Sequence, residues 1–157
     1  MADLRDLPLV DASVSDTATF AEAVSRLFDA QVPALAVLGS DGRLAGVLSE
    51  VDVLRAVFPR YLAELRHTAF LEDDLAALVE RTREVRDRRV VEFTRIVVPL
   101  DADESETHAA ERFLHTGEQA LPIVEGTRFL GMLSIAALCH ARLGRAGGPR
   151  AASYDQG

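Results

Sequence analysis

The chain has 157 residues, 48% of them hydrophobic and 27% charged. This composition is enough for a buried core and excludes a disordered or fibrous protein. Its formal net charge of −8 disfavours a nucleic-acid surface, because the phosphates would be repelled. The single cysteine, Cys139, cannot form an internal disulfide, which is typical of a reducing compartment. No apolar run has the length of a signal peptide or a membrane span, so we expect a soluble cytoplasmic protein without membrane or nucleic-acid partners.

The first part of the chain predicts the order β-α-β-β-α. An extended segment, LPLVDAS (7–13), is followed by apolar residues at helical spacing, and Thr19 with Glu22 matches a capping box at the start of that helix. Two short apolar runs, ALAVL (34–38) and LAGVL (44–48), are joined by a Gly-containing turn, which is typical of a hairpin. A second amphipathic helix follows them.

The insert between residues 58 and 92 is longer than a connector needs. It predicts two helices, over 61–70 and 72–90. In the second, one apolar face and an acidic cap are expected; the face is Leu75, Leu78, Val79, Thr82 and Val85, and the cap is Asp73 or Asp74. Arginines at positions 81, 83, 86, 88, 89 and 95 alternate with acidic residues. This pattern indicates a solvated, salt-bridged surface, with anion binding as the alternative.

The last part of the chain repeats the first. A segment TRIVVPLD (94–101), a helix, the run ALPIV, the run FLGML and a final helix ending near Gly144 reproduce the same order. Ser49 and Ser134 each stand where a helix should begin. The aligned pairs in the phrase GVLSEVD and its counterpart GMLSIAA are Gly46 with Gly131, Ser49 with Ser134, and Asp52 with Ala137.

Two such phrases in register, each after an Ala-bearing helix, resemble a pair of cystathionine β-synthase-type (CBS) domains, often called a Bateman module. The resemblance implies an α/β (α+β) fold in which tandem β-α-β-β-α repeats are related by pseudo-twofold symmetry, with a helical insert between them. The expected division is repeat 1 over 7–58, the helical insert over 59–92, repeat 2 over 93–143 and a flexible tail over 144–157. The family often has Pro where Ala36 stands in the first copy.

The resemblance also implies a ligand site. Members of the family bind adenosine-containing ligands such as AMP, ADP, ATP or S-adenosylmethionine between the two copies, so Asp52 is expected to accept hydrogen bonds from the ribose hydroxyls and Ser49 to lie near the phosphates. A carboxylate suits a vicinal diol, and such bonds are worth ~1.5–3 kcal/mol. Ala137 cannot accept a hydrogen bond, which predicts one competent and one degenerate site. Weaker candidate residues are Ser134, Val14, Ala34 and Ala36.

Ser-x-x-Asp is also a plain helix cap with a negative charge in the first turn, and that interpretation stays open. The four histidines (67, 108, 115 and 140) are scattered, so no metal site is expected; His108 and His115 suit a surface, and Cys139 suits a buried structural position. No nucleophile–base pair and no nucleotide-hydrolysis motif is present.

The sequence thus predicts a non-catalytic, energy-sensing regulatory module, homodimeric, which binds an adenosyl ligand, needs no cofactor, and modulates an unidentified protein partner through the insert. The alternative is a ligand-free CBS-pair scaffold for dimerisation or interaction.

Overall fold

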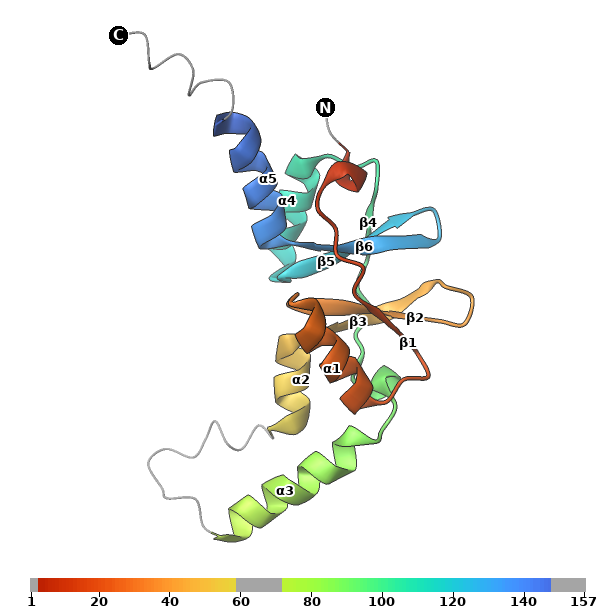
Figure 1. Cartoon of the computed structure of the whole chain (residues 1–157), viewed down its shortest axis with the longest axis vertical. Helices are drawn as coiled ribbons and strands as arrows, with labels where there is room; N and C mark the ends of the chain where they lie inside the picture. The colour runs from red at the N-terminus through yellow and green to blue at the C-terminus, as the bar shows by residue number, and fades with distance from the viewer. Residues whose placement is uncertain (1–2, 59–71, 148–157) are drawn as a thin grey trace, which may run out of the picture.

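The computed structural model describes residues 3–58 and 72–147, which form two similar halves (Figure 1). After a 3-10 turn η1 (Leu4–Asp6), the first half contains β1 (Ser13–Ser15), α1 (Phe20–Ala30), β2 (Ala34–Leu38), β3 (Leu44–Ser49) and α2 (Glu50–Val57). The helix α3 (Glu72–Arg86) and the 3-10 turn η3 (Val90–Phe93) follow. The second half contains β4 (Leu100–Asp101), α4 (Glu106–Thr116), β5 (Ala120–Glu125), β6 (Arg128–Ser134) and α5 (Ile135–Gly147). The predicted order β-α-β-β-α, written twice, is confirmed.

Each half contains a three-stranded sheet with the same topology and register. The first strand pairs parallel to the second, and the second pairs antiparallel to the third. Ala34 lies opposite Ser49 in the first sheet, and Ala120 lies opposite Ser134 in the second. The sheets lie side by side at the centre, with the helices on the outside (Figure 1). Met132 and Ala120 pack into the core of the first half, so the hydrophobic core continues across the boundary between the repeats.

The segment that leads into each half pairs with the sheet of the other half. Val10 and Met132 exchange two backbone hydrogen bonds of 3.0 and 2.8 Å, and Arg95 and Val47 exchange two of 3.0 and 2.8 Å. The predicted extended segments therefore form strands only at their ends, since their earlier residues cross to the opposite sheet. Buried side chains upstream of this crossing join the core of the second half; they are Leu4 and Leu7.

The crossings explain why a glycine recurs in the repeated phrase. A Cβ atom built on Gly46 would lie 2.3 Å from Thr94 Cγ2 and 2.6 Å from the carbonyl oxygen of Arg95. On Gly131 it would lie 2.8 Å from Leu9 Cβ. Both positions therefore need a residue without a side chain so that the other repeat's segment can approach.

Several predicted helix boundaries are confirmed by their hydrogen bonds. Thr19 and Glu22 form the complete capping box, with both backbone N–H groups donating to the partner side chain at 3.2 Å. The hydroxyl of Ser134 accepts a hydrogen bond from the N–H of Ala137 at 3.0 Å. The helix α5 continues past Gly144, where we expected it to end, because one glycine inside a helix costs only about 1 kcal/mol.

Helix α3 packs against the first half through its C-terminal part. Val85 is buried with Phe20 and Ala56, whereas Leu75 and Val79 on the predicted apolar face are about half exposed. The predicted helix over 61–70 and His67 lie outside the described residues, as do the side chains of the two candidate cap residues at 73 and 74.

The expectation of a buried thiol at Cys139 is wrong, because this residue is exposed. Its neighbour Leu138 is the buried residue of this turn of α5, and successive helical residues point about 100° apart. His108 and His115 are exposed, which confirms the surface position expected from the sequence. Among the described residues, no group of acidic, His or Cys side chains could hold a metal ion. Within the same ranges, no helix has both the length and the apolarity needed to cross a bilayer.

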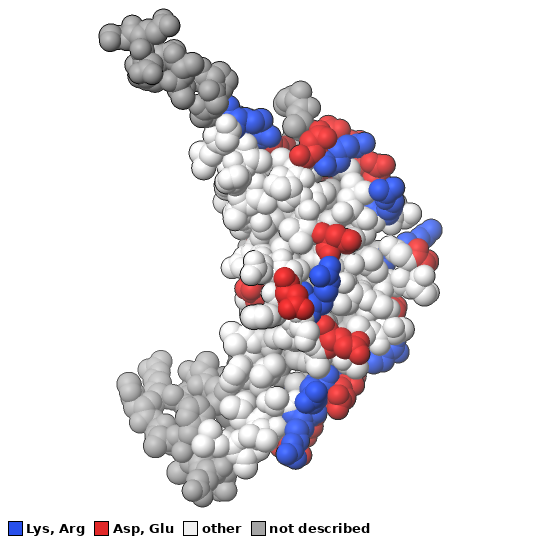
Figure 2. Space-filling model, in the orientation of Figure 1, with Lys and Arg blue, Asp and Glu red and all other residues white. Residues whose placement is uncertain are grey.

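Charged side chains of both signs are interspersed on the face of the molecule shown in Figure 2, mainly along one side of it. The acidic and basic residues there alternate instead of gathering by sign. This face has no extended basic surface of the kind that binds nucleic acid.

Candidate functional site

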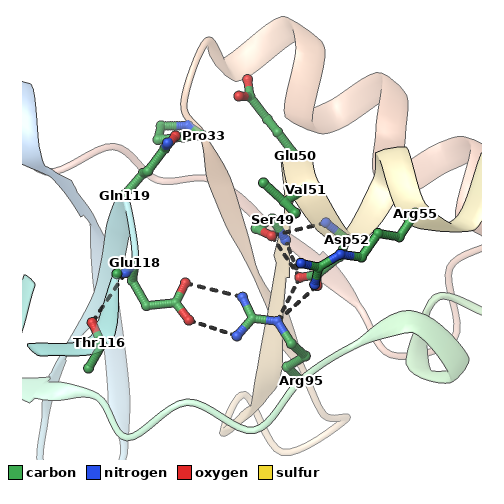
Figure 3. A pocket seen from close by; sticks show the side chains of 11 residues that line it. Pro33, Ser49, Glu50, Val51, Asp52, Arg55, Arg95, Thr116, Glu118 and Gln119 are labelled. Atoms are coloured by element: carbon green, nitrogen blue, oxygen red, sulfur yellow. Dashed lines mark hydrogen bonds and ion pairs between the residues drawn. The ribbon is translucent and has the colours of Figure 1, made fainter. Parts of the chain in front are cut away.

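A cleft of about 350 Å³ lies between the two repeats. The start of α2 forms one wall and the turn between α4 and β5 forms the other (Figure 3). Eleven residues line it: Pro33, Ser49, Glu50, Val51, Asp52, Arg55, Arg95, Thr116, Gly117, Glu118 and Gln119. Both principal residues predicted from the sequence, Ser49 and Asp52, are therefore placed together in one cavity.

Asp52 completes a capping box at the start of α2. Its Oδ2 accepts hydrogen bonds from the backbone N–H of Ser49 at 2.9 Å and from the Ser49 hydroxyl at 2.8 Å, while the N–H of Asp52 donates to Ser49 Oγ at 3.2 Å. This is the capping role that the sequence allowed. It does not use up the carboxylate, because Asp52 also faces the cleft (Figure 3).

The guanidinium of Arg95 joins Asp52 to a second carboxylate. Its Nε lies 2.9 Å from each oxygen of Asp52. Its Nη1 and Nη2 donate to the two oxygens of Glu118 at 2.7 and 3.1 Å. Planar, bidentate pairing of this kind gives the strongest hydrogen bonds between side chains.

The three members of this ion-pair network differ in exposure. The side chains of Asp52 and Glu118 are 9% and 13% exposed, and that of Arg95 is 41% exposed. Hydrogen bonding to Glu118 raises the pKa of Arg95 above its usual range against the opposing effect of burial, and pairing with Asp52 raises it further. Arg95 therefore stays charged at every physiological pH, so a rise in pH does not open the network by neutralising the guanidinium.

The backbone holds Arg95 in place between the repeats. The backbone of Arg95 pairs with that of Val47 on β3, at the edge of the first sheet. The segment that contains Arg95 nevertheless leads into the second half of the chain. The side chain then reaches Asp52 on α2 in one repeat and Glu118 beside β5 in the other (Figure 3). The network is thus an ionic contact across the boundary between the repeats.

The grouping of Arg95 with the solvent-facing arginines is wrong. That group describes Arg88, an exposed residue between α3 and η3 that pairs with Glu92, four residues further on, at 2.9 Å. Arg95 instead follows η3 and lies in the cleft. Sequence reasoning also missed Glu118, although comparison of the two copies carries a signal: the charged residues Arg95 and Glu118 stand where the first copy has the apolar Val10 and Val32.

The weaker candidate residues do not line this cleft. Ala34 and Ala36 lie on β2 and are buried, and Val14 lies on β1 beside it. Ser134 caps α5 in the second repeat.

The positions that correspond to the ion-pair network by the pseudo-twofold symmetry are all apolar, and they come from both repeats. Ala137 takes the place of Asp52, as the sequence showed. Val10 forms the backbone bridge to β6 that Arg95 forms to β3. Val32 follows the C-cap of α1, as Glu118 follows the C-cap of α4. The pseudo-symmetric location therefore lacks every charged group of the network.

The comparisons with known proteins agree with this architecture. The family model of the CBS domain matches residues 4–59 and 85–144, and the chain belongs to this family. Among curated proteins, no sequence matches the chain.

Solved structures show the same fold at low sequence identity. CBSX2 from Arabidopsis thaliana superposes with a TM-score of 0.68 at 20% identity, covering 92% of this chain and 96% of the other. CBSX2 in complex with AMP gives a TM-score of 0.68 at 18% identity, with coverages of 93% and 99%. The CBS domain of a CBS domain containing membrane protein from Sphaerobacter thermophilus gives 0.66 at 20% identity, with coverages of 89% and 87%.

Proposed function

We propose that this CBS pair is a non-catalytic regulatory module that binds one adenosine-containing ligand in the cleft beside Asp52. The observation that carries the proposal is the position of this carboxylate, nearly buried at the start of α2 and facing a cavity between the repeats. A carboxylate held in this way suits the vicinal hydroxyls of a ribose. The complex of CBSX2 with AMP supports an adenosyl ligand for the same fold.

The ligand would regulate by favouring one arrangement of the two repeats. Any ligand that binds one arrangement better than another shifts the population toward it. Because the ion-pair network spans the repeats, a ligand that contacts Asp52 also changes the contact between them. Homodimerisation and a partner surface on the insert extend this proposal, since Leu75 and Val79 of α3 expose large apolar side chains.

A ligand-free scaffold is the second candidate, and one observation favours it. The carboxylate of Asp52 already accepts hydrogen bonds from Ser49 and Arg95, so it is satisfied without a ligand. In a scaffold, the cleft would only join the two repeats, and no small molecule would change its stability.

Substitution of Asp52 with alanine separates the two functions. AMP, ADP, ATP and S-adenosylmethionine are added to the protein, and the rise in Tm that each produces is measured. We expect one of them to stabilise the wild type and Asp52→Ala to weaken its binding ten- to a hundred-fold, since it removes bonds worth ~1.5–3 kcal/mol. Titration calorimetry should then give one site per chain.

The control for this experiment removes a helix cap elsewhere. Ser105 caps α4 through a hydrogen bond from the N–H of His108 and does not line the cleft. Ser105→Ala should lower the Tm of the free protein, as loss of a cap does, but leave the ligand-induced rise unchanged. Absence of a ligand-induced rise in the wild type would support the scaffold, and an equal rise in wild type and Asp52→Ala would contradict a site at Asp52. Two equivalent sites per chain would contradict the single-site proposal.

A further inference from the structure

We infer that Arg95 is an internal competitor for the acceptor oxygens of Asp52 and thereby sets the affinity of the cleft for its ligand. This inference rests on the proposed function and adds a residue that controls it. Arg95 occupies the carboxylate in the free protein, so a ribose diol must displace its Nε to reach Asp52. Binding and release of the contact between the repeats are then one event.

The hydrogen bonds of Asp52 leave too few free acceptor sites for both hydroxyls of a diol. A carboxylate offers about four lone-pair sites. Two on Oδ2 are used by the N–H and the hydroxyl of Ser49, and Nε of Arg95 lies at 2.9 Å from both oxygens, across the remaining side of the group. A ligand that donates two hydrogen bonds to Asp52 would need the space that this N–H fills.

Glu118 makes Arg95 an effective competitor. It holds Nη1 and Nη2 through two hydrogen bonds of its own, and the backbone of Arg95 is fixed by its bridge to Val47. When Nε leaves Asp52, the guanidinium stays in the cleft and can return. An internal competitor of this kind lowers the apparent affinity by the fraction of molecules in which Asp52 is open.

Adenosine is the probe that isolates this effect. It carries the ribose diol and no charge, so its binding does not depend on a phosphate contact with any arginine. Arg95→Met keeps much of the apolar stem and removes every donor. We expect it to bind adenosine ten-fold or more tightly than the wild type does, because it removes a competing hydrogen bond between charged groups. Arg95→Lys keeps the charge without the planar donor set, and should give an intermediate affinity.

Salt supplies a readout that a purely structural role of Arg95 would not change. Ions weaken partly exposed ion pairs, so the wild type should bind the uncharged probe more tightly as NaCl rises from about 50 to 500 mM, and Arg95→Met should show no such dependence. This series on the wild type needs no substitution. Arg88→Met removes an arginine paired to Glu92 outside the cleft and should keep both the wild-type affinity and its salt dependence.

The possible outcomes distinguish this inference from the proposed function. If Arg95→Met binds adenosine no more tightly than the wild type and the salt dependence is the same in both, Arg95 is not a competitor, even if AMP binds at Asp52. If only Arg95→Met binds adenosine, the competitor is strong enough to close the cleft. If neither protein binds adenosine, AMP, ADP, ATP or S-adenosylmethionine, both proposals are overturned.

Discussion

The two repeats share a backbone design but differ at the location where a ligand would bind. The first residues of α2 and α5 donate their N–H groups to equivalent carbonyl oxygens, each belonging to the residue directly before the first strand of the hairpin. Glu50 donates to Pro33 at 2.9 Å, and Ile135 donates to Gln119 at 3.1 Å. Only the side chains differ. One location contains a bridged pair of carboxylates, and its counterpart contains Val10, Val32 and Ala137. Symmetry thus explains the fold, and departures from it identify the site.

This difference extends to all three members of the network. If only the counterpart of Asp52 had been replaced, an arginine and a glutamate would have remained there as a pair, with the Nε–H of the guanidinium left without its carboxylate. A partly buried donor without an acceptor is costly, so the three positions are expected to be charged together or apolar together. The difference between the two locations therefore concerns a whole packed cluster of side chains, and not only the residue expected to bind the ribose.

The largest expected effect concerns the crossings that both repeats share. Gly46→Ala places a Cβ against the backbone carbonyl of Arg95 at 2.6 Å, so the crossing segment must move, and we expect a loss of about 3 kcal/mol in the free energy of unfolding. Gly131→Ala meets its nearest atom, Leu9 Cβ, at 2.8 Å and should cost about 1–2 kcal/mol. Urea denaturation measures both.

The control for these glycine substitutions lies in α5. Nothing lies within 4 Å of a Cβ on Gly144, and alanine favours a helix over glycine by about 1 kcal/mol, so Gly144→Ala should stabilise the protein. Equal losses at Gly46 and Gly131 would show that the two crossings are equally tight, contrary to the structure.

A smaller effect compares the two serine caps. Ser49→Ala removes an N-cap and also the hydroxyl that donates to Asp52, whereas Ser134→Ala removes only a bond from the N–H of Ala137. We expect losses of about 2 kcal/mol for Ser49→Ala and about 1 kcal/mol for Ser134→Ala. Equal urea midpoints for the two variants would mean that the bond from Ser49 to Asp52 contributes nothing to stability.

The sequence predicted the repeated fold because each copy is locally consistent. Thr19 with Glu22, the two apolar runs and the serine caps each indicate the element that forms there. Agreement between local signals of this kind is what makes a chain specify one structure. Asp52 became a candidate through the phrase that is repeated in register in the two copies and resembles the CBS family, and the structure places it at the cleft.

The remainder of the site depends on contacts between distant parts of the chain. Arg95 is 43 residues from Asp52 and 23 from Glu118, so no local pattern connects them. The crossing of segments between the sheets brings them together, and that crossing is not visible in either repeat alone. The exposure of Cys139 was missed for a related reason, because it depends on which face of α5 packs against the core.

The smallest expected effect compares two turns that follow the first strand of each repeat. In the first repeat the turn contains the hydroxyls of Ser15 and Thr17, which lie 2.8 Å apart. In the second it contains two carboxylates, where hydrogen bonding to Asp101 and repulsion by its charge raise the pKa of Asp103. A raised carboxyl pKa means that the folded state binds the proton more tightly than the unfolded state does. Stability should therefore fall as the pH rises through the pKa of folded Asp103.

Asp103→Asn removes this titration and leaves the turn in place. Urea midpoints are measured from about pH 3.5 to 6, which brackets the ordinary aspartate pKa of about 3.9. As the pH rises, the stability of the variant should increase relative to that of the wild type. Because both side chains are close to solvent, the gain should be small and should shrink further at high salt. A difference between the two proteins that is constant with pH would mean that the carboxylates do not interact. The two turns would then be equivalent despite their different residues, unlike the two cleft locations.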